Sequence, residues 1–398
     1  MRRWPAAVPE LQAGGNMVDQ LHEAAIALAK EADTRRTELD YERRIPSDLF
    51  ERAGDAGLFR QLLCKTLGGL SRSPAEWFLT GVDMARWESS FSWVVTQGAA
   101  DVATYVAAAD PAFASSFLAD QRVYPASSDN TAGTLVPNGD GYLFSGKWNF
   151  CSGCHGATWV GGRGHFPLES GATEPDWRLA LVPIERARIE ENWNVLGMIG
   201  TGSHTVVVET QHIPAAWTFR IDRHGSEDYG PMSVMVGNGV WPIGTSVAAV
   251  QLGTARRAID AAMDLVKVKP GALRTRPLVE NAHVQRGLMR AEGAWFACLT
   301  GVERALAQLW ADAQVTRQLP LETRLRLLAA NAYASATSIN IIESMCEIVG
   351  TSIAPARGIF GACLRDARTI GSHASISGAM VEMGAQIKFG LSTDYTWI

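Results

Sequence analysis

The sequence predicts an α+β protein, mostly α, in which one β region separates two helical regions. Helical periodicity extends to about residue 120, and short β-rich runs broken by Gly, Pro, Asn and Asp continue to about residue 219. Long helical patterns return from about Met232 onward. We therefore expect an N-terminal helical domain over 1–120, a middle β-barrel or β-sandwich domain over 121–225, and a C-terminal four-helix bundle over 226–398.

The first domain is expected to contain at least three helices. In 17–30 one apolar face recurs at three- and four-residue steps, formed by Val18, Leu21, Ala25 and Leu28. Pro46-Ser47-Asp48 is typical of a helix start, with Pro at an early position and an acidic residue in the first turn. The range 89–108 is almost free of charge, so this helix is expected to be buried on most sides.

Strand and bundle patterns follow in order. Asn138-Gly139-Asp140-Gly141 predicts a hairpin turn, with a strand running on to Phe150, and further strands are expected at 178–184 and 205–210. Two long helices are expected in the bundle, joined by a short connection at 318–320 that favours antiparallel packing. Their apolar stripes are formed by Phe296, Leu299, Val302, Leu306 and Leu309, and by Leu321, Leu325, Leu328, Ala332, Ile339 and Ile342.

Composition excludes several classes of protein. The 398 residues are 47% hydrophobic and 19% charged, which is typical of a globular protein with an ample core. The formal net charge of −5 and the lack of a basic stripe argue against nucleic-acid binding. No apolar run reaches the ~18–20 residues of a membrane span, and the start does not resemble a signal peptide. We therefore expect a cytoplasmic protein without membrane association.

Cysteine usage fits reduced thiols, since the six cysteines are scattered through a long chain. Cys151-Ser-Gly-Cys154 would suit a redox motif at the start of a helix, but its surroundings have a strand pattern. A zinc site would need about four ligands, and no second pair has the usual spacing. We expect no metal.

Four stretches, spread over nearly the whole chain, resemble the acyl-CoA dehydrogenase superfamily. They are 141–154, 196–204 followed by Ile213-Pro214, Arg274-Thr-Arg276 with Val284-Gln285, and 364–373. The resemblance implies the same three-part fold. Dehydrogenases of this superfamily commonly supply a catalytic glutamate from the loop that follows the Arg365-Asp366 position. Here 371–378 contains no carboxylate, and His373 stands in that loop.

The pattern of Arg365-Asp366 followed by His373 is similar to the one found in a branch of two-component flavin-dependent monooxygenases. This branch includes the oxygenase component of 4-hydroxyphenylacetate hydroxylase, the secosteroid phenol hydroxylase and dibenzothiophene monooxygenase. The resemblance implies an enzyme that takes reduced FMN or FAD from a separate NAD(P)H:flavin reductase and forms a C4a-hydroperoxide with O2. It would then hydroxylate an aromatic or polycyclic small molecule. The resemblance also implies a homotetramer or dimer.

Site residues follow from the same resemblance. His373, which titrates near neutrality when unperturbed, is expected to act as an acid or base, and Ser152 to face flavin N5. Phe150 is expected on the same side of the strand as Ser152. The remaining cofactor-binding candidates are Trp148, Thr201, Ser203, Arg274 and Arg276, the two arginines for flavin phosphate and perhaps across a subunit interface. Arg365 and Asp366 are expected to form a structural ion pair.

Alternatives stay open at several positions. His373 would otherwise cap the turn at 375–377, and Phe150 would otherwise be a core residue. Several relatives place a substrate-contacting His on the helix 89–108, which has none here, so the pocket candidates are Trp93, Gln97, Ser127, Ser128 and Asn130. The alternative functions are oxygenation at nitrogen or sulfur, an FAD-dependent acyl-CoA dehydrogenase with a relocated base, and a degenerate binding subunit.

Overall fold

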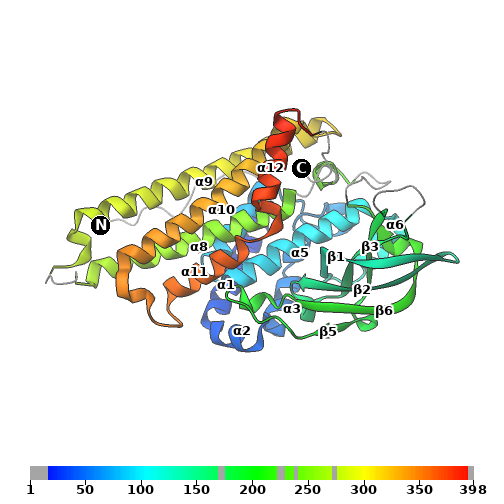
Figure 1. Cartoon of the computed structure of the whole chain (residues 1–398), viewed down its shortest axis with the longest axis horizontal. Coiled ribbons are helices and arrows are strands. Elements are labelled where there is room, and N and C mark those ends of the chain that lie inside the picture. Colours follow the sequence, from blue (N-terminus) through cyan, green and yellow to red (C-terminus); the bar gives the residue numbers. More distant parts are fainter. Residues whose placement is uncertain (1–16, 169–174, 222–228, 237–240, 271–275, 393–398) are drawn as a thin grey trace.

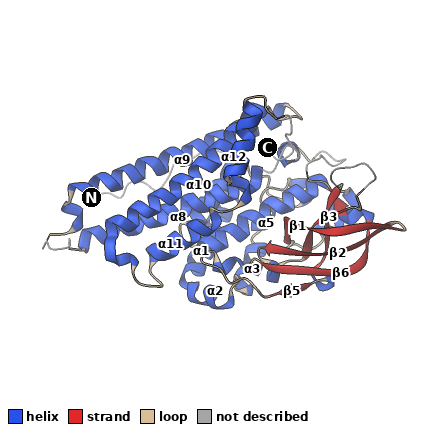
Figure 2. Cartoon of the chain, in the orientation of Figure 1, coloured by secondary structure: helices blue, strands red, loops and turns tan. Residues whose placement is uncertain are grey.

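The long C-terminal helices and the sheet occupy different ends of the molecule. The computed structural model describes residues 17–168, 175–221, 229–236, 241–270 and 276–392. The long helices α8 to α11 form one end, and the strands gather at the other (Figures 1 and 2). Helix α5 lies between them, so its side chains contact both.

The N-terminal helices agree with the periodicity of the sequence. The expected helix starts at 17 and 47 are confirmed, and the expected bounds of α5 are met at both ends. Most of α5 is buried, as its low charge predicted. The helices are α1 Met17–Thr34, α2 Arg36–Glu42, α3 Ser47–Asp55, α4 Pro74–Ala85, α5 Ser89–Ala108 and α6 Pro111–Phe117.

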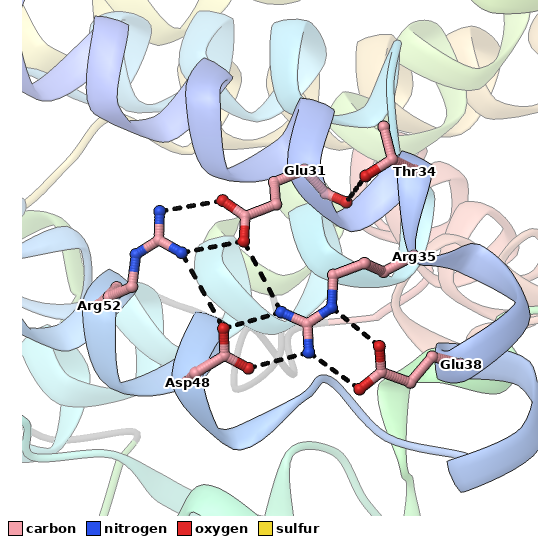
Figure 3. A network of polar contacts seen from close by, with 6 residues as sticks. All are labelled: Glu31, Thr34, Arg35, Glu38, Asp48 and Arg52. Carbon is pink, nitrogen blue, oxygen red and sulfur yellow. Dashed lines mark hydrogen bonds and ion pairs between the residues drawn. The ribbon is translucent and has the colours of Figure 1, made fainter.

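An exposed ion network joins α1, α2 and α3 (Figure 3). Arg35 forms hydrogen bonds with Glu38 and Asp48 at 2.7–2.9 Å, and Arg52 forms two with Glu31 at 3.0 Å. Single exposed ion pairs contribute little to stability, but bidentate pairs in a network hold their helices in register. The network holds α2 and α3 in place against α1.

Seven strands form one mixed sheet within the described residues, in the order β5-β6-β2-β1-β3-β4-β7. The predicted hairpin is confirmed, since Asn138 pairs with Gly141. Strands β1 and β3 are parallel, which the sequence did not indicate, and the other pairs are antiparallel. The strands are β1 Pro125–Asn138, β2 Gly141–Cys151, β3 Trp159–His165, β4 Trp177–Pro183, β5 Arg188–Glu190, β6 His204–Pro214 and β7 Thr218–Phe219.

The C-terminal helices pack side by side as a bundle around α8 and α10. The stripe expected on α9 is confirmed for its last four members, which are buried, but the side chain of Phe296 is 62% exposed. No described helix is long and apolar enough to cross a membrane. The helices are α7 Pro231–Val236, α8 Trp241–Val268, α9 Ala282–Val315, α10 Leu321–Val349, α11 Ile359–Ile370 and α12 Gly378–Lys388.

Candidate active site

The candidate site lies where α5, the end of β2 and the segment before α12 meet. Trp93 of α5 donates its Nε1 hydrogen to Ser152 Oγ at 3.0 Å. The Trp93 ring lies 5.4 Å from the ring of His373, centroid to centroid. Three predicted site residues from distant parts of the chain are therefore neighbours.

A chain of hydroxyl groups continues from Ser152. Its Oγ lies 2.7 Å from Ser203 Oγ, which lies 2.7 Å from Thr201 Oγ1. Thr201 donates its proton to the Met198 carbonyl at 2.8 Å, so it accepts from Ser203. Ser203 therefore accepts from Ser152, and the one proton of Ser152 is used. Because Ser152 also accepts from Trp93, the hydroxyl keeps a single free lone pair and acts toward any further partner as an acceptor.

The backbone at Phe150 has a left-handed conformation, with φ 65°. The strand ends at Cys151, and its pairing with β6 shifts between Trp148 and Cys151. The expectation that Phe150 and Ser152 share one face of a regular strand is therefore wrong. Phe150 is 55% exposed and meets Trp193 edge-on at 5.8 Å, so it is not a core residue either. A strained, exposed aromatic residue beside a polar site is typical of a ligand contact.

His373 is held by its own turn. The Ser375 N–H donates to His373 Nδ1 at 3.2 Å, so the neutral ring carries its proton on Nε2. The ring keeps some solvent contact, yet burial lowers its pKa from 6.5 to about 4. At neutral pH the ring is therefore uncharged. The capping interaction considered for this residue does form, and it leaves the Nε2–H group without a hydrogen bond to any described residue.

Tyr124 is a structural support for the site that the sequence analysis missed. Its hydroxyl lies 3.3 Å from the Val94 carbonyl and 3.2 Å from the Ser152 carbonyl, joining α5 to the end of β2. A Cβ at Gly98 would meet the Tyr124 ring at 2.3 Å, and one at Gly153 would meet its hydroxyl at 2.8 Å. No motif marks this tyrosine, because its role depends on two glycines distant in sequence.

The loop that carries Thr201 and Ser203 is anchored to the bundle. Met198, with φ 57°, donates its N–H to Asp366 Oδ1 at 2.7 Å, and Asp366 also pairs with Arg36 at 3.6 Å. Arg365 instead donates to the Ala356 carbonyl at 3.2 Å. The expected pairing of Arg365 with Asp366 is therefore wrong, because successive residues of α11 point in different directions.

Two of the predicted cofactor residues have other contacts, and a third lies outside the described residues. Trp148 is fully buried, stacks on Phe144 at 5.1 Å and donates to the Arg163 carbonyl at 3.1 Å, so it is a core residue and not a flavin contact. Arg274 lies outside the described residues. The side chain of Arg276 is 81% exposed and pairs with Glu280 at 3.7 Å.

The pocket candidates divide into two groups. Trp93 is buried, and Gln97 is half-buried one turn further along α5. Ser127 is hydrogen-bonded to Tyr105, while Ser128 accepts from the N–H of Asn130 at 3.3 Å, and Asn130 is exposed. Only Trp93 is linked to Ser152 by a hydrogen bond.

The cysteines Cys151 and Cys154 are buried free thiols. Burial raises the pKa of both, that of Cys154 to about 12. They remain thiols and donate to the carbonyls of Trp148 and Gly202, each at 3.4 Å. Within the described part of the chain, no group of three or more His, Cys, Asp or Glu side chains is arranged to hold a metal ion.

Comparison with known proteins relates the chain to enzymes of one fold. Residues 245–378 match the family model of the acyl-CoA dehydrogenase C-terminal domain. The chain is 26% identical to the indole-3-acetate monooxygenase of Pseudomonas putida over 368 residues, covering 89% of this chain and 90% of that protein.

Two solved structures have the same fold. The HsaA monooxygenase from M. tuberculosis superposes with a TM-score of 0.85 at 22% identity, over 96% of this chain and all of that chain. XiaF from Streptomyces sp., in complex with FADH2 and glycerol, superposes with a TM-score of 0.83 at 20% identity, over 94% and 97%. The chain has the acyl-CoA dehydrogenase fold and is a homologue of flavin-dependent monooxygenase oxygenase subunits.

Proposed function

We propose that this protein is the oxygenase component of a two-component monooxygenase, which uses externally supplied reduced FAD or FMN and O2 to oxygenate an aromatic small molecule. The observation that carries the proposal is the polarity of the hydroxyl chain. Reduced flavin presents a hydrogen at N5, whereas oxidised flavin presents an acceptor there. Ser152, with its proton donated to Ser203, suits the reduced form.

The residues around Ser152 fit a flavin ring. Phe150 offers an exposed aromatic face beside it, and the backbone of the loop at Gly202 allows close approach, with φ 53°. Reduced flavin, when bound, supplies the electrons that activate O2. Trp93 orients the Ser152 hydroxyl, and neutral His373, whose ring lies 5.4 Å from the Trp93 ring, holds a proton on Nε2. The buried surroundings of α5 exclude water, which favours oxygen transfer over loss of peroxide.

Partners follow from the same proposal. A separate NAD(P)H:flavin reductase would supply the flavin, because one relative, 24% identical, is named as the oxygenase component of an FADH2-dependent resorcinol hydroxylase. A homotetramer would cover two exposed apolar side chains of α9, since Met289 is 71% and Phe296 is 62% exposed. Seven residues separate these two side chains, so they lie on one face of the helix.

Oxygen isotope labelling and flavin titration test this function. With 18O2 and chemically reduced flavin, we expect one labelled oxygen atom in the product, and reduced flavin should bind more tightly than oxidised flavin. Ser152→Ala should lose most of this preference. A protein purified with tight yellow FAD that an acyl-CoA bleaches would instead be a dehydrogenase. Failure to bind flavin in either redox state would favour a binding subunit.

A further inference from the structure

Trp93 and Ser203 both contact the Ser152 hydroxyl, but they belong to different parts of the chain. Trp93 lies on α5, and the N-terminus of this helix is capped by Glu88, whose Oε2 accepts the Phe91 N–H at 2.6 Å. A carboxylate is favoured at the N-terminus of a helix, where backbone N–H groups lack intrahelical partners. The position of Glu88 therefore helps to fix where α5 begins.

A second carboxylate holds the loop 198–203. Asp366 Oδ1 of α11 accepts the Met198 N–H at 2.7 Å, and the backbone at Met198 has the left-handed conformation. A non-glycine residue keeps this conformation only where its surroundings hold it. At Gly197 the chain approaches α11 so closely that an added Cβ would lie 2.3 Å from the Arg365 carbonyl. The start of the loop is therefore fixed to α11.

Arg36, the first residue of α2, lies between these two carboxylates. Its guanidinium is 3.2 Å from Glu88 Oε1 and 3.6 Å from Asp366 Oδ2, and the two acidic side chains are 4% and 11% exposed. Burial raises the pKa of Glu88 to about 7, and Arg36 is the strongest of the groups that lower it. Arg257, a second cation near Glu88, is bound to Asp33 at 2.6 Å. Arg36 is thus the cation that the two carboxylates share.

The turn 199–201 of the loop packs against both α2 and α5. A Cβ added at Gly200 would lie 3.1 Å from the Leu39 side chain of α2 and 3.2 Å from the Ser90 side chain of α5. Close-packed interiors transmit small displacements, because no free space absorbs them. A change in the spacing of α2 and α5 would therefore be passed to the loop and to its hydroxyl groups.

We propose that Arg36 is a positioning residue for the flavin site. By binding both carboxylates, it keeps α5 and the loop 198–203 at a fixed spacing. At that spacing Trp93 donates to Ser152, and Ser203 accepts the Ser152 proton. The inference rests on the proposed function for the role of Ser152, and it adds a residue outside the hydroxyl chain that sets the polarity of this chain.

Arg36→Met tests this inference through flavin binding. The variant keeps an apolar stem but leaves the two buried carboxylates without their shared cation, so their repulsion should separate α5 from the loop. We expect the preference for reduced over oxidised flavin to fall by roughly fivefold or more, measured by anaerobic titration of the full-length protein. Arg36→Lys, which returns a positive charge to the same place, should restore most of the preference.

A double variant and a control separate positioning from a general loss of stability. In Ser203→Ala the hydroxyl chain is already broken, so adding Arg36→Met should change the ratio of the two dissociation constants little further. Arg256→Met is the matched control, because Arg256 also bridges two carboxylates, Asp260 and Glu292, each at 2.8 Å, and its side chain is 12% exposed. It should lower the free energy of unfolding and leave the ratio unchanged.

Amide hydrogen exchange in the protein without flavin measures the link itself. The Met198 N–H should exchange roughly tenfold faster in Arg36→Met than in the unmodified protein, and at the unmodified rate in Arg256→Met. Mass spectrometry of peptides covering 196–204 gives the values. Asp366→Asn serves if Arg36→Met does not fold, since it keeps an acceptor for the Met198 N–H but loses the ion pair, and it should lower the flavin preference in the same direction.

An unchanged flavin ratio or an unchanged exchange rate in Arg36→Met would overturn the inference, as would a fall in the ratio that Ser203→Ala does not mask. These outcomes are distinct from failure of the proposed function. If the protein binds no flavin, exchange at Met198 still decides whether Arg36 holds the loop. If only the inference fails, product is labelled and reduced flavin is preferred, but Arg36→Met behaves as Arg256→Met does.

Discussion

At the scale of the residue, Ser152 illustrates how one side chain is given a fixed polarity by its neighbours. Its hydroxyl could donate or accept in isolation. Trp93 supplies a donor and Ser203 takes the proton, because Thr201 is committed to the Met198 carbonyl. The hydrogen bond of Thr201 to the Met198 carbonyl therefore decides, through Ser203, which redox state of flavin Ser152 suits.

Ser203→Ala tests this polarity directly. Without Ser203, the Ser152 proton is free to turn toward oxidised flavin, so the preference for reduced flavin should shrink by about five- to tenfold. Anaerobic titrations with reduced and oxidised flavin measure the ratio. Ser145→Ala is the control, since the Ser145 hydroxyl pairs with exposed Thr134 elsewhere on the sheet. An unchanged ratio in Ser203→Ala would contradict the assigned directions.

His373 gives a prediction for the pH dependence of stability. Its pKa is about 4 in the folded protein and 6.5 ordinarily, so between these values the unfolded chain binds more protons. The contribution of neutral His373 is fully present above about pH 6.5 and is lost as the pH falls toward 4. His373→Gln should reduce the loss of unfolding free energy between pH 7 and pH 5, measured by urea titration. An identical loss in both proteins would show that the ring is not desolvated.

At the scale of the element, α5 and the end of β2 are held together by Tyr124 in a close-packed slot. The residue pattern of α5 predicted the helix and its burial correctly. It did not predict that Gly98 leaves room for the ring of Tyr124, the residue just before β1. Interiors are packed closely, so one added methyl group is felt where no atom can move aside.

Gly98→Ala should destabilise the protein by about 1–3 kcal/mol and weaken flavin binding, since the added Cβ meets the Tyr124 ring at 2.3 Å. Chemical unfolding and flavin titration give the two values. Gly301→Ala is the matched control: Gly301 is exposed on α9 with nothing within 4 Å, and alanine there should stabilise by roughly 0.5–1 kcal/mol. Equal effects of the two substitutions would exclude the packing explanation.

At the scale of the whole molecule, the single chain leaves an apolar face of α9 uncovered. Sequence periodicity placed Phe296 in the core stripe, because an interface residue has the same hydrophobic pattern as a core residue. In the structure it is 62% exposed, with Met289 one heptad away. Arg276, whose side chain is 81% exposed, lies just before α9 in the same bundle.

Phe296→Glu should shift the protein to a smaller assembly, because a carboxylate would have to be buried between subunits. Sedimentation or light scattering measures this shift, and flavin affinity should fall with it if a neighbouring subunit contacts the phosphate. Tyr41→Glu on α2 is the control, since Tyr41 is 83% exposed on a different helix. If Phe296→Glu keeps the assembly of the unmodified protein, the α9 face is not an interface.

The sequence by itself determined the order of helices and strands, the bounds of α5 and the hairpin at Gly141. Local periodicity and turn chemistry suffice for the elements, because they act between near neighbours. Only the tertiary structure decided which polar atoms lie unpaired and in what environment. It lowered the pKa of His373, turned Phe150 outward and placed Trp148 in the core, because burial and hydrogen bonding depend on residues distant in the chain.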